Sequence, residues 1–176
     1  MSFEKGLERR TARIIVIIPA FNEKSKIVRV LQKIPRELVG EIVVVNDGST
    51  DGTREAINKY NYKVIEHEQN IGVGAALKSG IRYAIENNYS IIVVLAGNNK
   101  DNTGEITNLV NPIIKEGYDY VQGSRFVPGG RYDHLPPFRF IMVKIHAFLF
   151  SILTGRRCTD ALNGFRAYRL SIFNDK

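Results

Sequence analysis

Polar side chains that can bind a charged ligand follow the apolar runs of this sequence. Residues 42–45 are all β-branched and apolar, and they lead directly into the stretch NDGSTDGT at 46–53. Short polar residues and glycines of this kind form a tight loop, in which Asp51 is placed to cap a helix that begins near Thr53. Open α/β sheets bind ligands at the carboxyl ends of their parallel strands, so the carboxylate of Asp47 is the first candidate for a binding role.

Two further stretches carry groups of the same kind. The apolar run 90–96 is followed by GNNKD at 97–101, which offers amide, ammonium and carboxylate groups. The stretch NIGVGAALKSG at 70–80 has two glycines followed by small residues, which predicts a loop that opens a helix. Small residues there allow close approach of either a ligand or a neighbouring element of the fold. The glycines do not directly follow a first strand, so a dinucleotide-dependent oxidoreductase is not predicted.

These loops connect strands and helices that alternate along the first 123 residues. Apolar runs predict strands at 13–19, 41–46, 63–66, 90–96 and 118–123. Apolar spacing and turn residues predict helices at 24–34, 53–60, about 70–87 and 105–116. Such alternation predicts an α/β fold with a mostly parallel central sheet flanked by helices.

The composition is that of one folded domain. The chain has 176 residues, of which 44% are hydrophobic, and its single cysteine, Cys158, excludes a disulfide within the chain. The charged N-terminus, MSFEKGLERR, lacks the apolar core of a secretory signal. The formal net charge of +7 suggests an anionic partner such as a phosphorylated ligand or an acidic lipid. Basic residues are scattered, so we expect no nucleic-acid partner.

Residues 138–153 form an apolar segment interrupted by Arg139, Lys144, His146 and Ser151. A helix with so little polar surface is buried in something. We expect it to be too short and too charged to span a bilayer, which leaves the protein core, a subunit contact or the plane of a membrane interface. The protein core is the first expectation.

Five stretches, taken in order, resemble glycosyltransferase family 2, and within it the polyprenyl-phosphate hexosyltransferases related to dolichol-phosphate mannose synthase. They are IIPAFNE at 17–23, VVVNDGSTDGT at 43–53, NIGVGAALKSG at 70–80, GSR at 123–125 and TDALNGFRAY at 159–168. The resemblance implies a GT-A type fold, a nucleotide-diphosphate sugar as donor and inversion at the anomeric carbon. It makes residues 13–176 the catalytic domain, preceded by an extension at 1–12. We expect that domain to be shortened at its C-terminus, because members commonly continue further.

The resemblance also implies residues that bind the nucleotide sugar. Three would border the nucleoside, and a fourth would bond to its base: Pro19, Phe21 and Glu23, and then Asp47. Others would lie at the nucleotide sugar without an assigned contact: Gly72, Lys78 and Asn98.

Catalytic roles are implied for Asp160, at the position of the family's proposed catalytic carboxylate, and for Arg125, which would face the phosphates or the acceptor. A hydroxyl acceptor needs a general base, whereas a polyprenyl phosphate, with a second pKa of about 6, arrives largely ionised. With a phosphate acceptor Asp160 could serve orientation, and a structural role as a cap or turn residue stays open. Guanidinium groups match phosphate oxygens, and the candidates for gripping the acceptor phosphate are Arg131, Arg139 and Arg166.

One departure from the family concerns the metal. The family usually has Asp-x-Asp after the fourth strand, where two carboxylates hold Mg²⁺ or Mn²⁺ on the donor diphosphate, but the aligned residues here are Ala96 and Asn98. An aliphatic side chain cannot coordinate a hard cation, and an amide oxygen is a poorer ligand than a carboxylate. Either Asn98 and Asp101 keep a weakened metal site, or Lys100 supplies positive charge to the leaving diphosphate. The histidines show no metal-ligand spacing and are interpreted as non-catalytic: His67, His134 and His146.

The sequence therefore predicts an inverting hexosyltransferase acting on a polyprenyl or dolichyl phosphate. One alternative is the same fold transferring sugar to a saccharide or protein hydroxyl. Another is a noncatalytic nucleotide-sugar-binding protein, which Ala96 and Asn98 favour. A lipid-linked acceptor would explain both the basic charge and the apolar segment 138–153, and it would place the protein at the cytoplasmic face of a membrane.

Overall fold

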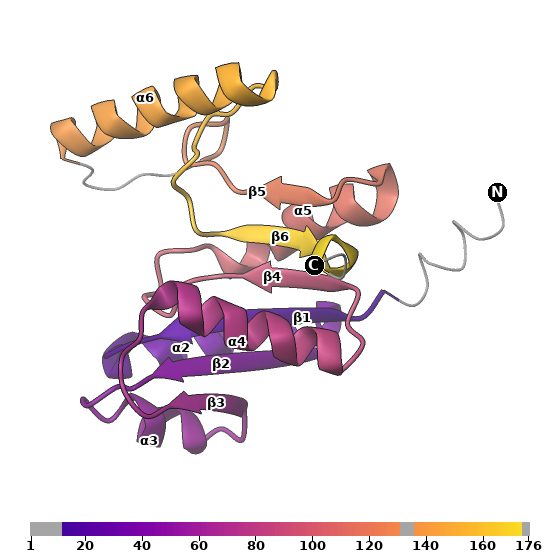
Figure 1. Ribbon diagram of the computed structural model, residues 1–176. Helices are drawn as coiled ribbons and strands as arrows, with labels where there is room; N and C mark the ends of the chain where they lie inside the picture. Colours follow the sequence, from indigo (N-terminus) through magenta and orange to yellow (C-terminus); the bar gives the residue numbers. More distant parts are fainter. Residues whose placement is uncertain (1–11, 131–135, 174–176) are drawn as a thin grey trace, which may run out of the picture. The chain divides into compact units, whose positions relative to one another are not determined.

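The structure of the protein is a computed structural model that describes residues 12–130 and 136–173. It divides into two compact units. The first unit comprises the chain up to Val121 and again from Phe165, and the second comprises Gln122–Gly164. The elements of both are labelled in Figure 1.

The first unit is built on a six-stranded sheet with the order β3-β2-β1-β4-β6-β5 (Figure 1). β1 pairs in parallel with both β2 and β4, and β2 pairs in parallel with β3, whereas β4 and β6 are antiparallel. The bounds are β1 (Ile14–Ala20), β2 (Glu41–Asp47), β3 (Lys63–His67), β4 (Ile91–Val94), β5 (Tyr120–Gln122) and β6 (Arg166–Arg169). The predicted strands are all present, and the mostly parallel sheet is confirmed. β6 was not predicted.

Helices connect the parallel strands. They are α2 (Lys24–Lys33), α3 (Thr53–Asn58), α4 (Val73–Glu86) and α5 (Ile106–Asn111), with short 3₁₀ helices η1 (Arg36–Leu38), η2 (Thr103–Glu105) and η4 (Leu170–Phe173). The helix predicted at 105–116 is broken, because α5 ends at Asn111 and η3 (Pro112–Glu116) is a π-helix. Pro112 has no N–H for the helical ladder, and its ring clashes with the preceding turn, which accounts for the change.

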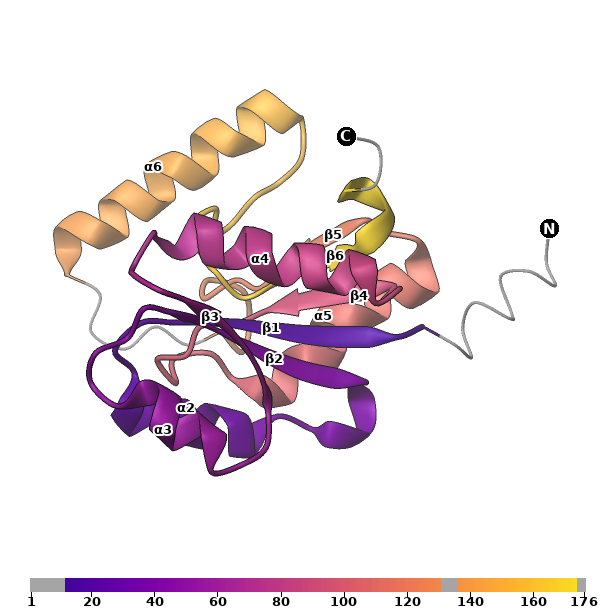
Figure 2. The same cartoon turned by 60° about the horizontal axis from the view of Figure 1, so that its bottom comes forward.

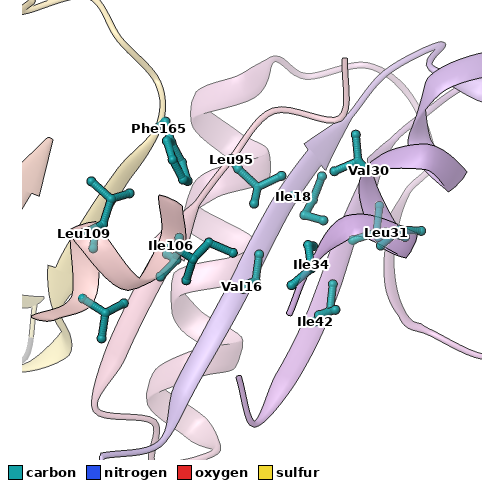
Figure 3. Packing of buried hydrophobic residues seen from close by; sticks show 14 of the residues in the cluster. Val16, Ile18, Val30, Leu31, Ile34, Ile42, Leu95, Ile106, Leu109 and Phe165 are labelled. Atoms are coloured by element: carbon teal, nitrogen blue, oxygen red, sulfur yellow. The ribbon is translucent and has the colours of Figure 1, made fainter. Parts of the chain in front are cut away.

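Successive residues of the central strands pack on opposite faces of the sheet. Val16 and Ile18 of β1 belong to a core cluster with α2, α3 and α5 (Figure 3), whereas Ile15 and Ile17 belong to a second cluster with α4. Figure 2 shows α4 on one face of the sheet and α2 and α3 on the other. Both clusters fill the space between helices and sheet, which is why the central strands are apolar on both faces.

The small residues of α4 serve its contact with the sheet. Ala76, Gly80 and Ala84 are buried, and a Cβ atom on Gly80 would lie 2.5 Å from Cγ2 of Ile17. Of the two explanations for the small residues after Gly74, a close helix-to-sheet contact therefore applies to Gly80.

Glu41, at the start of β2, accepts hydrogen bonds from two tyrosine hydroxyls. The Oη atoms of Tyr83 and Tyr89 lie 3.0 and 2.8 Å from Oε2 of Glu41. Burial and the hydrogen bond to Glu41 raise the pKa of Tyr89 to about 12, and the same two causes raise the pKa of Tyr83. The cluster lies at the amino end of the parallel strands, away from the edge where ligands bind.

This cluster predicts a loss of stability at high pH. The pKa of Tyr89 is about 12 when folded, against about 10 in an unfolded chain. Its contribution is therefore complete below pH 10 and is lost as the pH rises through 12. Tyr89→Phe is expected to cost roughly 1.5–3 kcal/mol at neutral pH, the contribution of a hydrogen bond to a charged group. Urea unfolding of both proteins between pH 7 and 12 measures this, and equal alkaline slopes would contradict the assignment.

Candidate functional site

The loops that follow β1 and β2 are joined by hydrogen bonds at the carboxyl edge of the sheet. The backbone N–H of Asn22 donates to Oγ of Ser49 (3.0 Å), and the N–H of Thr50 donates to Oδ1 of Asn22 (2.9 Å). The N–H of Glu23 donates to Oγ1 of Thr53 (2.9 Å). The two loops are thus fixed relative to each other before any ligand binds.

Asp51 serves the start of two helices. Its Oδ1 accepts from the N–H of Thr53, the first residue of α3, at 2.9 Å, although the N-cap residue of α3 is Gly52 and not Asp51. Its Oδ2 accepts from the N–H of Lys24, the first residue of α2, at 3.1 Å. Burial acts to raise the pKa of Asp51, but the hydrogen bonds from Thr53 and Lys24 outweigh it and leave the pKa below its ordinary value. The stabilisation holds above the unfolded pKa and is lost as the pH falls through the folded one.

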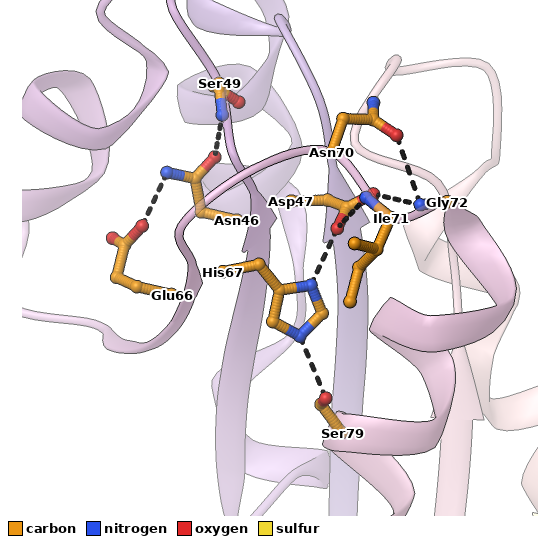
Figure 4. Close-up of polar contacts among 9 residues, drawn as sticks. All are labelled: Asn46, Asp47, Ser49, Glu66, His67, Asn70, Ile71, Gly72 and Ser79. Carbon is orange, nitrogen blue, oxygen red and sulfur yellow. Dashed lines mark hydrogen bonds and ion pairs between the residues drawn. The ribbon is translucent and has the colours of Figure 1, made fainter.

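Asp47 ends β2 with a buried side chain whose two oxygens are already engaged (Figure 4). Oδ2 accepts from the N–H of Gly72 at 2.8 Å, and Oδ1 accepts from the N–H of Ile71 at 3.2 Å. Oδ1 also lies 2.6 Å from Nδ1 of His67. Burial acts to raise the pKa of Asp47, but these hydrogen bonds and the nearby imidazole lower it overall. Asp47 is therefore an ionised carboxylate that holds the loop at the start of α4.

His67 makes a contact with Asp47 that reasoning from the sequence does not predict. The lack of metal-ligand spacing leads to its interpretation as non-catalytic, and in the structure it joins Asp47 to Oγ of Ser79, which lies 2.9 Å from Nε2. The signal was available in the strand pattern, because Asp47 and His67 are the last residues of adjacent parallel strands and are paired in register.

The other residues expected at the nucleotide sugar lie around the same edge. Pro19 is half-buried near the end of β1, and Phe21, in the next loop, is exposed. Glu23 precedes α2, and its Oε2 accepts from Nζ of Lys26 at 3.1 Å. Gly72 is the N-cap of α4, and Lys78 is exposed further along that helix.

The loop after β4 is closed by its own hydrogen bonds. Oδ2 of Asp101 accepts from the N–H of Ala96 at 2.8 Å, and Oδ1 of Asn98 accepts from the N–H of Lys100 at 3.1 Å. Within residues 12–130 and 136–173, no three His, Cys, Asp or Glu side chains are grouped so that they could hold a metal ion. The two carboxylates of the family's Asp-x-Asp site are replaced here by Ala96, which cannot coordinate a cation, and by Asn98, whose Oδ1 already accepts a backbone N–H. This pair does not fit the Mg²⁺ or Mn²⁺ that two carboxylates would hold.

The second unit contains a buried ion pair between Arg125 and Asp160. Nε of Arg125 lies 2.7 Å from Oδ2 of Asp160, and Nη2 lies 2.9 Å from Oδ1, which is the bidentate geometry of a strong pair. The backbone N–H of Arg125 also donates to Oδ2, at 3.1 Å. The side chain of Asp160 is 0% exposed, and that of Arg125 is 26% exposed. Asp160 accepts three hydrogen bonds from Arg125, so its present contacts orient that arginine.

Neighbouring contacts hold the two chain segments of this site together. Oγ1 of Thr159 donates to Oγ of Ser124 at 2.7 Å, and Nε2 of Gln122 donates to the carbonyl of Asn163 at 2.9 Å. The structure thus brings together the stretches GSR and TDALNG, which are far apart in the sequence.

The arginines expected at the acceptor phosphate are not brought together in one unit. Arg139 is exposed on α6 (Pro137–Thr154) in the second unit, and Arg166 is half-buried in β6 of the first. Arg131 lies outside the described residues.

Helix α6 is largely exposed, so the expectation of a core position is wrong. Only 11% of the helix is buried, by Val143 and Ala147, while the most exposed side chains include Leu153 (84%), Phe138 (76%) and Phe148 (65%). The expectation that this helix is too short and too charged to cross a bilayer is also wrong. In the described part of the chain it is the one helix that meets the length and composition for a span. Those criteria alone do not distinguish a span from other apolar helices.

The fold is an α/β fold in which polar loops follow the parallel strands β1, β2 and β4, the edge where open α/β sheets generally bind ligands. The chain belongs to glycosyl transferase family 2, whose family model matches residues 15–175. The match covers both units, and the predicted family is confirmed.

Relatives with named activities are similar over most of this chain. The UDP-N-acetylglucosamine–dolichyl-phosphate N-acetylglucosaminyltransferase of Methanococcus voltae is 30% identical over 90% of this chain and 70% of its own length. The polyprenol monophosphomannose synthase of Mycolicibacterium smegmatis is 29% identical over 93% of this chain and 64% of its own. The dolichol-phosphate mannosyltransferase of Pyrococcus furiosus is 31% identical over 91% and 47%. The chain thus spans about half to two thirds of the length of these relatives.

The crystal structure of glucosyl-3-phosphoglycerate synthase from Mycobacterium tuberculosis, in complex with Mn²⁺, UDP-glucose and phosphoglyceric acid, has the same fold. It superposes with a TM-score of 0.73 at 23% identity and covers 98% of this chain and 62% of its own. This likeness confirms the predicted GT-A type fold.

Proposed function

We propose that this chain is the catalytic part of an inverting glycosyltransferase that transfers a hexose from a nucleotide-diphosphate sugar to a polyprenyl phosphate. The observation that carries the proposal is the family match across both units, since it includes the Asp47 edge and the Arg125–Asp160 pair. Relatives named for transfer to dolichyl and polyprenyl phosphates support the acceptor class.

The donor binds where β1, β2 and β4 end. Pro19, Phe21 and Glu23 border the nucleoside, and the exposed ring of Phe21 offers an apolar face to the base. Asp47 has one accepting position left on Oδ2 once its hydrogen bonds with His67, Ile71 and Gly72 are counted, and a base N–H can use it. Positive charge for the departing diphosphate comes from Arg125 and from the exposed Lys100.

Transfer is a single displacement at the anomeric carbon. An oxygen of the acceptor phosphate attacks from the side opposite the diphosphate, a carbon–oxygen bond to the acceptor forms, and the bond to the leaving nucleoside diphosphate breaks with inversion. The acceptor phosphate is largely ionised at neutral pH, so no proton has to be removed from it. Asp160 is a positioning residue in this scheme, because its oxygens hold the guanidinium of Arg125.

The acceptor brings the protein to the cytoplasmic face of a membrane through α6. The segment from Pro136 to Thr159 contains no acidic residue and has four basic ones: Arg139, Lys144, Arg156 and Arg157. Exposed apolar side chains on a helix with cations and no acids suit an interface with anionic headgroups. The occupant proposed for this surface is therefore an anionic lipid bilayer.

Sedimentation with vesicles tests this surface. The protein is expected to co-sediment with vesicles containing anionic lipid and much less with zwitterionic ones. Phe148→Asp combined with Ile152→Asp should lower partitioning at least about tenfold, because burying one large apolar side chain contributes roughly 1.5–3 kcal/mol. Leu38→Asp, at an exposed apolar residue in η1, is the control and should partition like the unchanged protein. Equal recovery of all proteins with and without anionic vesicles would contradict the assignment.

The activity itself is tested with uridine, guanosine and thymidine diphosphate sugars, each offered a polyprenyl phosphate, the matching polyprenol and a free saccharide. Transfer is expected to the phosphate alone, with an inverted anomeric centre in the product. Donor affinity is expected to be the same with Mg²⁺, with Mn²⁺ and with chelator, because Ala96 and Asn98 stand where the family has two carboxylates. Transfer to the saccharide would favour the hydroxyl-acceptor enzyme, and donor binding without transfer or hydrolysis would favour a noncatalytic binding protein.

A further inference from the structure

His67 lies at a junction of three elements around Asp47 (Figure 4). It ends β3 beside the last residue of β2, and Ser79 reaches its far nitrogen from α4. The side chain of Asp47 is 4% exposed and that of His67 is 12% exposed, so water has little access to the contact between them. A hydrogen bond to an ionised group that is shielded in this way is one of the stronger kinds.

The position of one ring proton follows from the partner of Nδ1. The ionised carboxylate of Asp47 can only accept hydrogen bonds, so Nδ1 of His67 carries a proton and donates it. In the neutral imidazole Nε2 is then the acceptor, and the hydroxyl of Ser79 is its donor. Both ring nitrogens therefore have a defined role, and the ring is held between two neighbours.

Asp47 passes this constraint to the loop that begins α4. Its oxygens accept the N–H groups of Ile71 and Gly72, and Gly72 is the N-cap of the fourteen-residue α4. A carboxylate at the N-terminus of a helix is stabilised by the free N–H groups and the helix dipole. If the side chain of Asp47 rotated away, those two N–H groups would lose their acceptor. The loop would then no longer be held by these hydrogen bonds.

We propose that His67 is a positioning residue for the nucleotide-sugar donor. It fixes the carboxylate of Asp47 so that the Ile71–Gly72 loop stays closed and the remaining lone pair on Oδ2 faces the nucleobase. This inference rests on the proposed function for the identity of the ligand. The hydrogen bonds that hold the Ile71–Gly72 loop do not depend on which ligand binds.

Two substitutions separate the two sides of the ring. In His67→Asn the amide nitrogen replaces Nδ1 and can still donate to Asp47, whereas in His67→Gln the longer amide replaces Nε2 and reaches only toward Ser79. We expect His67→Asn to keep the donor KM within about threefold. His67→Gln should raise it about tenfold or more, as the loss of a hydrogen bond to a charged group predicts, with kcat and the acceptor KM little changed. Ser79→Ala should resemble His67→Asn.

Two measurements without substrate accompany the kinetics. Amide exchange followed by NMR should show the N–H groups of Ile71 and Gly72 protected in the unchanged protein and in His67→Asn, and exposed in His67→Gln. Nitrogen-15 spectra of the unchanged protein should show the His67 tautomer with the proton on Nδ1. This measurement does not depend on whether any variant folds.

The outcomes are distinct. A proton on Nε2 with a bare Nδ1, equal amide protection in the Asn and Gln variants, or a loss confined to kcat would each overturn the proposal. If the unchanged protein binds none of the nucleotide sugars, the proposed function fails, while the tautomer and the amide exchange still decide whether His67 positions the loop.

Discussion

Replacing Arg125 with alanine is expected to destabilise the second unit by about 3–5 kcal/mol, the usual cost of removing one partner of a buried ion pair. The side chain of Asp160 is 0% exposed and loses both guanidinium hydrogen bonds, so its charge is left in a shielded position. Because the same arginine faces the departing diphosphate in the proposed reaction, transfer should fall at least about 100-fold. Urea unfolding and the rate of transfer measure the two effects.

Two further substitutions are compared with Arg125→Ala. Asp160→Asn should cost less stability than Arg125→Ala, because it leaves behind the guanidinium, which is 26% exposed and can reach water. Arg82→Ala, at an exposed arginine on α4 to which no role is assigned, should change neither unfolding nor the chemical step. Near-normal transfer by a folded Arg125→Ala protein would show that this arginine does not act on the donor.

Gly48→Ala is expected to open the donor site. Gly48 has φ +68°, which side-chain-bearing residues rarely adopt, and an added Cβ would lie 2.4 Å from the carbonyl carbon of Gln69. Backbone cannot yield as a flexible side chain can, so the loop between β3 and α4 must shift. We expect a loss of roughly 2–4 kcal/mol from overpacking and the strained φ together. Donor affinity should fall with it, because the displaced loop carries Ile71 and Gly72.

Gly74→Ala is the control for that experiment. Nothing lies within 4 Å of a Cβ at Gly74, and the residue is helical, so alanine should stabilise the protein by about 0.5–1 kcal/mol. Thermal unfolding and donor titration of both variants check the pair. Equal stability of the two would contradict the close approach at Gly48.

Most of the sheet could be predicted from the sequence, because its parallel strands are apolar on both faces and each is followed by a polar loop. β6 could not be predicted, since its four residues, RAYR, carry two arginines and form no apolar run. Its place is set by antiparallel pairing with β4, more than 70 residues earlier in the chain, and local pattern does not report such a partner.

The residues of the candidate site also divide into those that could be predicted from the sequence and those that could not. Asp51 could be assigned from the polar loop, because its partner Thr53 is two residues away. Asp47 could be singled out as the acid that ends an apolar strand, but its partner Gly72 lies 25 residues further along the chain and could not be predicted from the loop. The pairing of His67 with Asp47 depends on strand register, and that of Asp160 with Arg125 depends on a contact across 35 residues. The position of α6 could not be read from its apolarity, because an apolar helix does not say what covers it.

The second unit begins as β5 ends and returns through β6, and these two strands are neighbours in the sheet. For an excursion that starts and finishes on adjoining strands, the entropic cost of closure rises only slowly with its length, by about 0.6 kcal/mol for each doubling. Such a cassette can be lengthened, trimmed or exchanged in evolution while the register of the parallel strands stays unchanged. In the proposed reaction, the acceptor could therefore change through mutations in this one contiguous segment, while the strand ends proposed to bind the donor stay the same.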